Sequence, residues 1–139
     1  MLRCTLPGHA RIAFAALNSN LFYWFITTCS DCRNLNLREV CGLPLDLASI
    51  DPSLQQELCQ LSSQLAANLR AHSRTRPMAF AGPGCLTIQC LYPAFAKALI
   101  DQVDRLLARH YAFSEEELDF LLSYDEKYRR ARPMARPGR

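Results

Sequence analysis

The hydrophobic and polar positions of this chain follow a helical repeat over several stretches, and the clearest of these is residues 52–72. Asp51 is placed to cap this helix, Pro52 suits its first position, and leucines recur every three or four residues. The stripe consists of Leu54, Leu58, Leu61, Leu65 and Leu69. This spacing predicts an amphipathic helix with one buried face.

Two further helices are predicted closer to the C-terminus. The first begins near Pro93, with one apolar face and one charged face. We expect Phe95, Leu99, Val103, Leu106 and Leu107 to be buried, and Lys97, Asp101, Asp104 and Arg105 to be exposed. The second begins at Ser114, which can form a capping box with Glu117, and its buried side consists of Leu118, Leu121 and Leu122.

The remaining segments are less regular. Residues 9–28 have helical spacing, but the polar notch Asn18, Ser19 and Asn20 favours caps and turns over a helix interior. The notch predicts two short helices, or one helix whose notch faces another group. Residues 30–47 lose the helical period and are predicted to form short extended pieces, and residues 73–90 a loop that ends in a short strand.

These elements predict a mainly α fold with short β strands (α+β), of a size that 139 residues can fill as one domain. Half of the residues are hydrophobic and 21% are charged, which is ordinary for a globular protein. The longest apolar run, residues 21–26, is far shorter than the roughly 20 residues that cross a bilayer. The start of the chain also lacks the pattern of a secretory signal, so we expect a cytoplasmic protein with no membrane partner.

Cysteine spacing offers one candidate metal or redox motif. Seven cysteines is an odd number, and we expect most of them to be free, partly buried thiols. Cys29 and Cys32 have the spacing of half a zinc site or of a redox pair, with Cys41 and His9 as conceivable further ligands. Because no second pair occurs at zinc-ribbon spacing, we predict no metal, and a small zinc module on Cys29, Cys32 and Cys41 is the alternative.

Candidate catalytic groups have simpler interpretations. Asp101 and Asp104 share one face of a predicted helix, where paired carboxylates serve acid–base or metal chemistry. With Lys97 and Arg105 nearby, we interpret them as a solvated ion-pair face. His110 has no recognisable nucleophile as partner and is interpreted as a structural histidine at a helix end.

The C-terminal residues 127–139 hold six of the sixteen lysines and arginines, and Tyr124 and Tyr128 lie just before or within this run. Such a run suits nucleic acid because it neutralises phosphates, and a solubilising tail is the alternative.

Two blocks of the sequence resemble large restriction-modification enzymes that carry an adenine-specific DNA methyltransferase. Residues 92–130, "YPAFAKALIDQVDRLLARHYAFSEEELDFLLSYDEKYRR", resemble the C-terminal end of that family, which closes with a pattern like I-D-x-I-D-x-x-L-A-x-x-Y-G-F-[ST]-x-E-E-L-D-F-I-x-x-Y-D-x-K-Y-R. Residues 15–46, "AALNSNLFYWFITTCSDCRNLNLREVCGLPLD", resemble the L-N-S-x-L-F-x-W segment of the family's target-recognition region. The blocks occur in the family's order.

The resemblance implies a C-terminal fragment whose partners are double-stranded DNA and the missing methyltransferase domain. It divides the chain into the end of a target-recognition domain (1–72), a variable loop or linker (73–90), a terminal helical segment (91–130) and a disordered basic tail (131–139). In such enzymes one domain grips DNA while another flips out an adenine and methylates it with S-adenosylmethionine. The candidate DNA contacts are Asn18, Asn20, Arg33, Asn36, Arg38, Lys127, Arg129 and Arg130.

Departures from the family limit what this chain can do. The catalytic N-P-P-Y motif and the glycine motif for the cofactor are absent, so we assign it no catalytic residue and no cofactor of its own. Ala112 stands where the family usually has Gly. A fragment that begins inside a domain is also expected to expose apolar surface on its first helix and on the leucine stripe. The alternative is a stand-alone helical protein-interaction module, without a DNA role, that pairs this stripe with a partner helix.

Overall fold

The computed structural model describes residues 7–33, 35–79 and 85–128, and these form a mainly helical fold with one β-hairpin. The predicted fold class, mainly α with short β strands, is confirmed. The elements in chain order are α1 (Pro7–Leu17), α2 (Asn20–Cys29), α3 (Leu37–Gly42), α4 (Pro52–Ala71), β1 (Arg74–Ala79), β2 (Cys85–Cys90), the 3-10 helix η1 (Pro93–Ala96), α5 (Lys97–Tyr111) and α6 (Glu115–Tyr128). No helix in these ranges is long and apolar enough to span a membrane.

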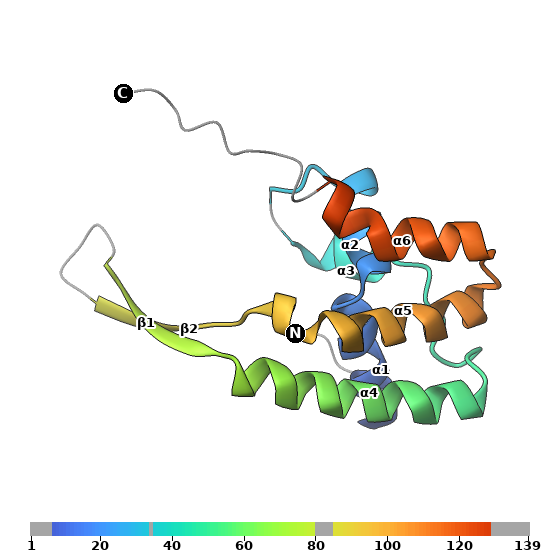
Figure 1. Cartoon of the computed structure of the whole chain (residues 1–139), viewed down its shortest axis with the longest axis horizontal. Coiled ribbons are helices and arrows are strands. Elements are labelled where there is room, and N and C mark those ends of the chain that lie inside the picture. The colour runs from blue at the N-terminus through green and yellow to red at the C-terminus, as the bar shows by residue number, and fades with distance from the viewer. Residues whose placement is uncertain (1–6, 34, 80–84, 129–139) are drawn as a thin grey trace.

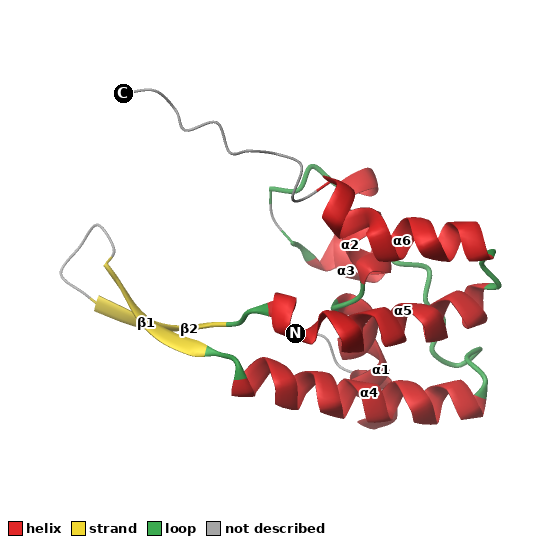
Figure 2. Ribbon diagram, viewed as in Figure 1, coloured by secondary structure: helices red, strands yellow, loops and turns green. Residues whose placement is uncertain are grey.

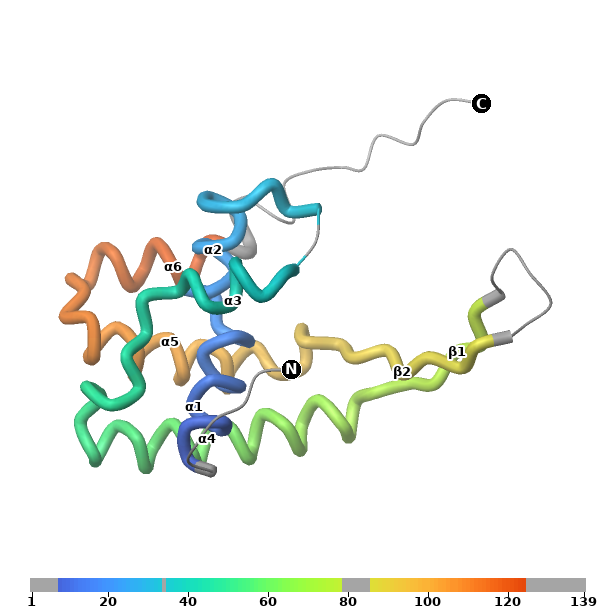
Figure 3. Tube along the Cα trace, turned by 180° about the vertical axis from the view of Figure 1, so that it is seen from behind, coloured from blue at the N-terminus to red at the C-terminus, as the bar shows by residue number. Residues whose placement is uncertain are grey.

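Helices α4, α5 and α6 lie side by side with α5 in the middle, and α5 runs in the opposite direction to the other two (Figure 1). Helix α1 packs against α4 and α5, while α2 packs against α5 and α6. The tube drawn from behind shows the same order (Figure 3). Both sequence blocks of the resemblance therefore contribute to one helical body.

Four of the five leucines in the stripe of α4 are buried within this body, and Leu61 is partly buried. Leu54, Leu58, Leu65 and Leu69 are between 0% and 7% exposed. On α1, Ile12 is fully buried as well. The expectation that the first helix and the leucine stripe expose apolar surface is therefore wrong, because α1 and α5 cover α4. Each fully buried leucine stabilises the fold by about 1.5–3 kcal/mol relative to an exposed one.

The helix that begins at Pro93 differs from its prediction in its first turn. This turn is the 3-10 helix η1, whose tighter period takes Phe95 out of register with the apolar face of α5. Phe95 is 63% exposed instead of buried, and its ring stacks on His72 with 4.8 Å between the ring centroids. The aromatic pair thereby joins the end of α4 to η1.

The capping box of α6 is confirmed. The backbone N–H of Ser114 donates to Glu117 Oε2 at 2.8 Å, and the backbone N–H of Glu117 donates to Ser114 Oγ at 3.2 Å. The preceding helix α5 is followed by its C-cap residue Ala112, whose φ of 52° and ψ of 43° lie in the left-handed region that glycine favours. The position where the family pattern has glycine is therefore a left-handed helix cap.

Two segments differ from their sequence predictions. Within residues 35–47 the structure has no strand and forms α3, because Glu39 accepts a hydrogen bond from the backbone N–H of Asn36 at 3.0 Å and caps the helix. The predicted loop and single strand of residues 73–90 contain two strands, which pair antiparallel from Arg74↔Cys90 to Ala79↔Cys85. Figure 2 shows that this hairpin extends away from the helices. Pro77 is tolerated because a two-stranded ribbon consists of edge strands.

Candidate nucleic-acid interface

The polar notch at residues 18–20 is the junction between α1 and α2, so the prediction of two short helices is confirmed. Ser19 is the N-cap of α2, and its hydroxyl accepts a hydrogen bond from the backbone N–H of Phe22 at 3.1 Å. The same hydroxyl donates to the carbonyl oxygen of Ala16 at 2.6 Å. Ser19 thus satisfies polar backbone groups of both helices at the break.

The first turn of α2 faces a buried carboxylate on α5. Asp104 Oδ2 accepts hydrogen bonds from the backbone N–H of Asn20 at 3.1 Å and from its side-chain amide at 2.7 Å. Asp104 Oδ1 accepts a third from the backbone N–H of Leu21 at 3.0 Å. These N–H groups lack helical partners, and the positive end of the helix dipole also favours a carboxylate there.

Asp104 is 1% exposed, so its assignment to a solvated face is wrong. Hydrophobic periodicity predicts that a charged residue on a helix is exposed. It contains no information on a carboxylate that caps a second helix, as Asp104 does. Burial raises the pKa of Asp104 to about 6, against the hydrogen bonds from Leu21 and Asn20, which lower it. The nearby carboxylate of Asp101 also raises this pKa. Within this arrangement the role of Asp104 is to hold α2 against α5.

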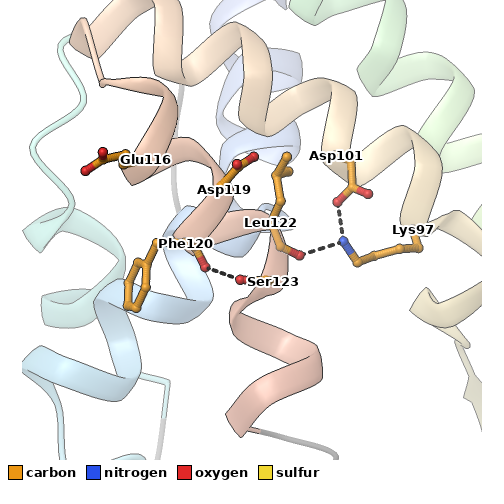
Figure 4. Close-up of a pocket in the computed structure, with 7 residues that line it drawn as sticks. All are labelled: Lys97, Asp101, Glu116, Asp119, Phe120, Leu122 and Ser123. Carbon is orange, nitrogen blue, oxygen red and sulfur yellow. Dashed lines mark hydrogen bonds and ion pairs between the residues drawn. The ribbon is translucent and has the colours of Figure 1, made fainter.

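Asp101 lies one turn earlier on α5 and is partly exposed. It accepts a hydrogen bond from the side-chain amide of Asn20 at 3.3 Å and pairs with Lys97. The ammonium group of Lys97 also donates to the carbonyl oxygen of Leu122 at 3.1 Å, which ties α5 to α6 (Figure 4). The ion-pair interpretation therefore fits Asp101, though not Asp104.

The hollow beside this ion pair is open to solvent and predominantly acidic (Figure 4). It has a volume of about 720 Å³, and Lys97 is its one basic lining residue. The lining residues are Lys97, Asp101, Glu116, Asp119, Phe120, Leu122 and Ser123. Three carboxylates against one ammonium disfavour phosphate, so this face of α5 and α6 is a poor surface for nucleic acid.

Two candidate DNA contacts, Asn18 and Asn20, have their side-chain amides engaged inside the protein. Asn20 is 7% exposed and bonds to both aspartates of α5. The amide of Asn18 donates to the carbonyl oxygen of Phe14 at 2.8 Å, at the end of α1. The structure therefore gives both asparagines a role in the α1–α2 junction.

Arg33, Asn36 and Arg38 are exposed, in the connection after α2 and in the first turn of α3. Arg38 lies 3.6 Å from the carboxylate of Glu39, but its side chain is 87% exposed. Because the Arg38 side chain is mostly in solvent, its guanidinium remains accessible to an anion.

The last turns of α2 and α6 are adjacent. The hydroxyl oxygens of Thr27 and Tyr124 lie 2.9 Å apart, and the rings of Tyr23 and Tyr124 meet edge to face. Lys127 falls in the last turn of α6, beyond Tyr124, although its side chain lies outside the described part. Arg129, Arg130 and the tail 131–139 also lie outside the described residues. The connection that carries Arg33 thus begins where the end of α2 contacts α6 near Tyr124.

The five cysteines with described side chains are free. Cys29, Cys32 and Cys41 are exposed, so the expectation of partial burial is wrong for them, whereas Cys59 and Cys90 are partly buried. In the described ranges, no three His, Cys, Asp or Glu residues lie close enough to hold a metal ion together. His110 lies in the last turn of α5, where its ring contacts Tyr111 edge to face.

No family model, curated protein or solved structure matches this chain. The relation to restriction-modification enzymes therefore remains a prediction from the two sequence blocks.

Proposed function

We propose that this chain is the DNA-binding C-terminal portion of a site-specific adenine DNA methyltransferase of a cytoplasmic restriction-modification system. It would comprise the end of the target-recognition domain and the terminal helical segment. Methyl transfer from S-adenosylmethionine would belong to the missing catalytic domain, because this chain has neither the catalytic nor the cofactor motif. The contribution of the chain would be to hold double-stranded DNA.

The observation that carries this proposal is the contact between the two sequence blocks. Asp104, from the second block, bonds to the backbone of Asn20 and Leu21, from the first. Asn20 directly follows the L-N-S of the recognition-region pattern, and Asp104 is the second aspartate of the I-D-x-I-D pattern. The contact packs the two blocks against each other, which the proposal requires because it assigns both blocks to the end of one enzyme.

Support for DNA as the partner comes from the basic groups. Arg33, in the connection after α2, and Arg38, in the first turn of α3, are exposed, and the C-terminal run is basic in sequence. The acidic hollow of α5 and α6 disfavours phosphate on that face, so we expect the contact elsewhere on the molecule. Guanidinium groups bind phosphate oxygens in bidentate geometry, so arginine suits this role.

The proposal is tested by fluorescence anisotropy of a labelled duplex, titrated with the purified chain over a salt series. The expected result is an affinity that falls steeply with salt, with a slope of about −0.9 per phosphate contacted. A chain ending at Tyr128 is titrated in parallel, after circular dichroism has established that it is folded. Binding that survives this deletion supports DNA contacts in the folded segment. Binding that disappears assigns the signal to the tail charge and contradicts the proposal.

The alternative function is a stand-alone helical module that binds another protein. The surface expected to bind that partner, the leucine stripe of α4, is not available. The leucine stripe that would pair with a partner helix is covered by α1 and α5. If the folded chain does not bind DNA, the protein-interaction function would nevertheless be favoured over the DNA-binding function.

A further inference from the structure

The β1–β2 hairpin has the least support from the rest of the protein. It projects beyond the ends of α4 and η1 in both views (Figures 1 and 3). Every residue from Arg74 to Met78 on β1 is exposed, as are Leu86, Thr87 and Gln89 on β2. An isolated two-stranded hairpin is marginally stable in water. Both of its faces are available to a ligand that would also stabilise it.

The charge of this region is entirely positive. The sequence contains no Asp or Glu between Glu57 and Asp101, but it contains Arg70, Arg74, Arg76 and Lys97. Lys97 is already paired with Asp101. Among the described residues, no carboxylate lies within ion-pair distance of the three arginines. The dipole of α4 stabilises the positive charge of Arg70 in its last turn. It does not stabilise the charges of Arg74 and Arg76, which lie on β1.

One group of acidic residues lies at the opposite end of the helical body. The first turn of α6 holds Glu115, Glu116 and Glu117, and Asp51 caps the first turn of α4. Both of these turns lie at the end remote from the hairpin (Figure 1). The arginines at the hairpin, which lack an acidic partner among the described residues, attract a polyanion to that end of the molecule.

Strand geometry places the two strand arginines together. Arg74 and Arg76 are two residues apart on β1, so their side chains leave the same face of the ribbon. Their partners across the ladder, Cys90 and Ile88, carry no charge. At the base, the stacked rings of His72 and Phe95 join the last turn of α4 to η1 and fix where the ribbon begins.

We propose that the β1–β2 hairpin is a DNA-contacting arm, in which Arg74 and Arg76 bind phosphates of the duplex backbone and Arg70 reinforces the contact at the base. A two-stranded ribbon also has the width that the major groove of duplex DNA admits. This proposal rests on the proposed DNA-binding function. It moves the main contact to a segment that the sequence patterns assign to a variable loop, and it adds three arginines that those patterns do not single out.

The test compares two double variants of the full chain that remove the same charge. Arg74→Gln/Arg76→Gln removes the proposed contacts, and Arg11→Gln/Arg105→Gln removes two exposed arginines from α1 and α5. Binding to a labelled duplex is measured by fluorescence anisotropy from about 50 to 200 mM salt. Circular dichroism and thermal melting establish that each variant remains folded, which exposed strand positions should permit.

Loss of two phosphate contacts should lower the magnitude of the salt slope by about 2 and weaken binding roughly 10- to 100-fold near 0.1 M salt. The Arg11/Arg105 variant should keep the slope of the original chain. If the original chain binds DNA and both variants bind as tightly as the original chain, the arm proposal is overturned while the proposed function stands. If the original chain does not bind, both fail. Equal loss in both variants would indicate net charge alone and would also overturn the arm.

Discussion

Asp104 on α5 accepts two hydrogen bonds from Asn20 on α2, at 3.1 Å from the backbone N–H and at 2.7 Å from the side-chain amide. The two residues are 84 positions apart in the sequence. With the bond from Leu21, this contact caps α2 by a carboxylate from another helix. It joins the two blocks of sequence on which the proposed function rests.

Replacement of Asp104 by Ala should lower the free energy of unfolding by about 2–4 kcal/mol, because buried donors of Asn20 and Leu21 lose their acceptor. Relief of the buried charge offsets part of the loss. Asp101→Ala is the matched control one turn away, and it should cost about 1 kcal/mol or less because Asp101 is partly exposed. Urea denaturation at pH 7 measures both. Equal losses would show that Asp104 has no special structural role.

Asp104 also predicts a pH dependence. Its pKa is about 6 in the folded protein, whereas an unfolded aspartate titrates near about 3.9, so the folded state binds more protons between these values. The contribution of Asp104 to stability should therefore increase as pH falls from about 7 to about 4.5, by about 2 kcal/mol.

The measurement is the difference in unfolding free energy between the original chain and Asp104→Asn, taken in urea at several pH values. This comparison cancels the titration of the other carboxylates. The difference should shift in favour of the original chain on acidification. A shift in the opposite direction would mean that the hydrogen bonds outweigh burial and lower the pKa of Asp104.

Ala112→Gly should stabilise the protein by about 0.5–1 kcal/mol. Ala112 has a φ of 52°, and a left-handed conformation costs a residue with a Cβ about 1–2 kcal/mol. Glycine removes this strain, but its greater entropy in the unfolded chain offsets part of the gain. The control is Ala67→Gly at an exposed position within α4, which should destabilise by about 0.5–1 kcal/mol. The melting temperature of each variant is measured. Melting temperatures that change in the same direction for both variants would contradict the left-handed cap.

Local patterns in the sequence predicted the elements that local forces determine. The leucine stripe of α4 follows from helical period, and the box of Ser114 and Glu117 follows from a capping motif within four residues. The preference of Asn and Ser for caps and turns also predicts the break at residues 18–20. Each of these signals lies within a single element.

Contacts between distant elements were missed. The burial of Asp104 depends on α2, which is 84 residues away in sequence at Asn20, and a charged residue on a helix is otherwise expected to be outside. Phe95 is exposed because its turn is a 3-10 helix and because its ring stacks on the ring of His72. The hairpin arginines had a usable signal, the absence of acidic residues from 58 to 100, but their grouping depends on the pairing of β1 with β2.

The most direct test of DNA binding by the folded chain is a nuclear magnetic resonance titration of the ¹⁵N-labelled protein with a short duplex. We expect shifts of backbone amide signals in β1, in β2 and around Arg33 and Arg38, with little change in the acidic first turn of α6. Shifts confined to residues after Tyr128, or no shifts at an equimolar ratio of duplex to folded protein, would contradict it.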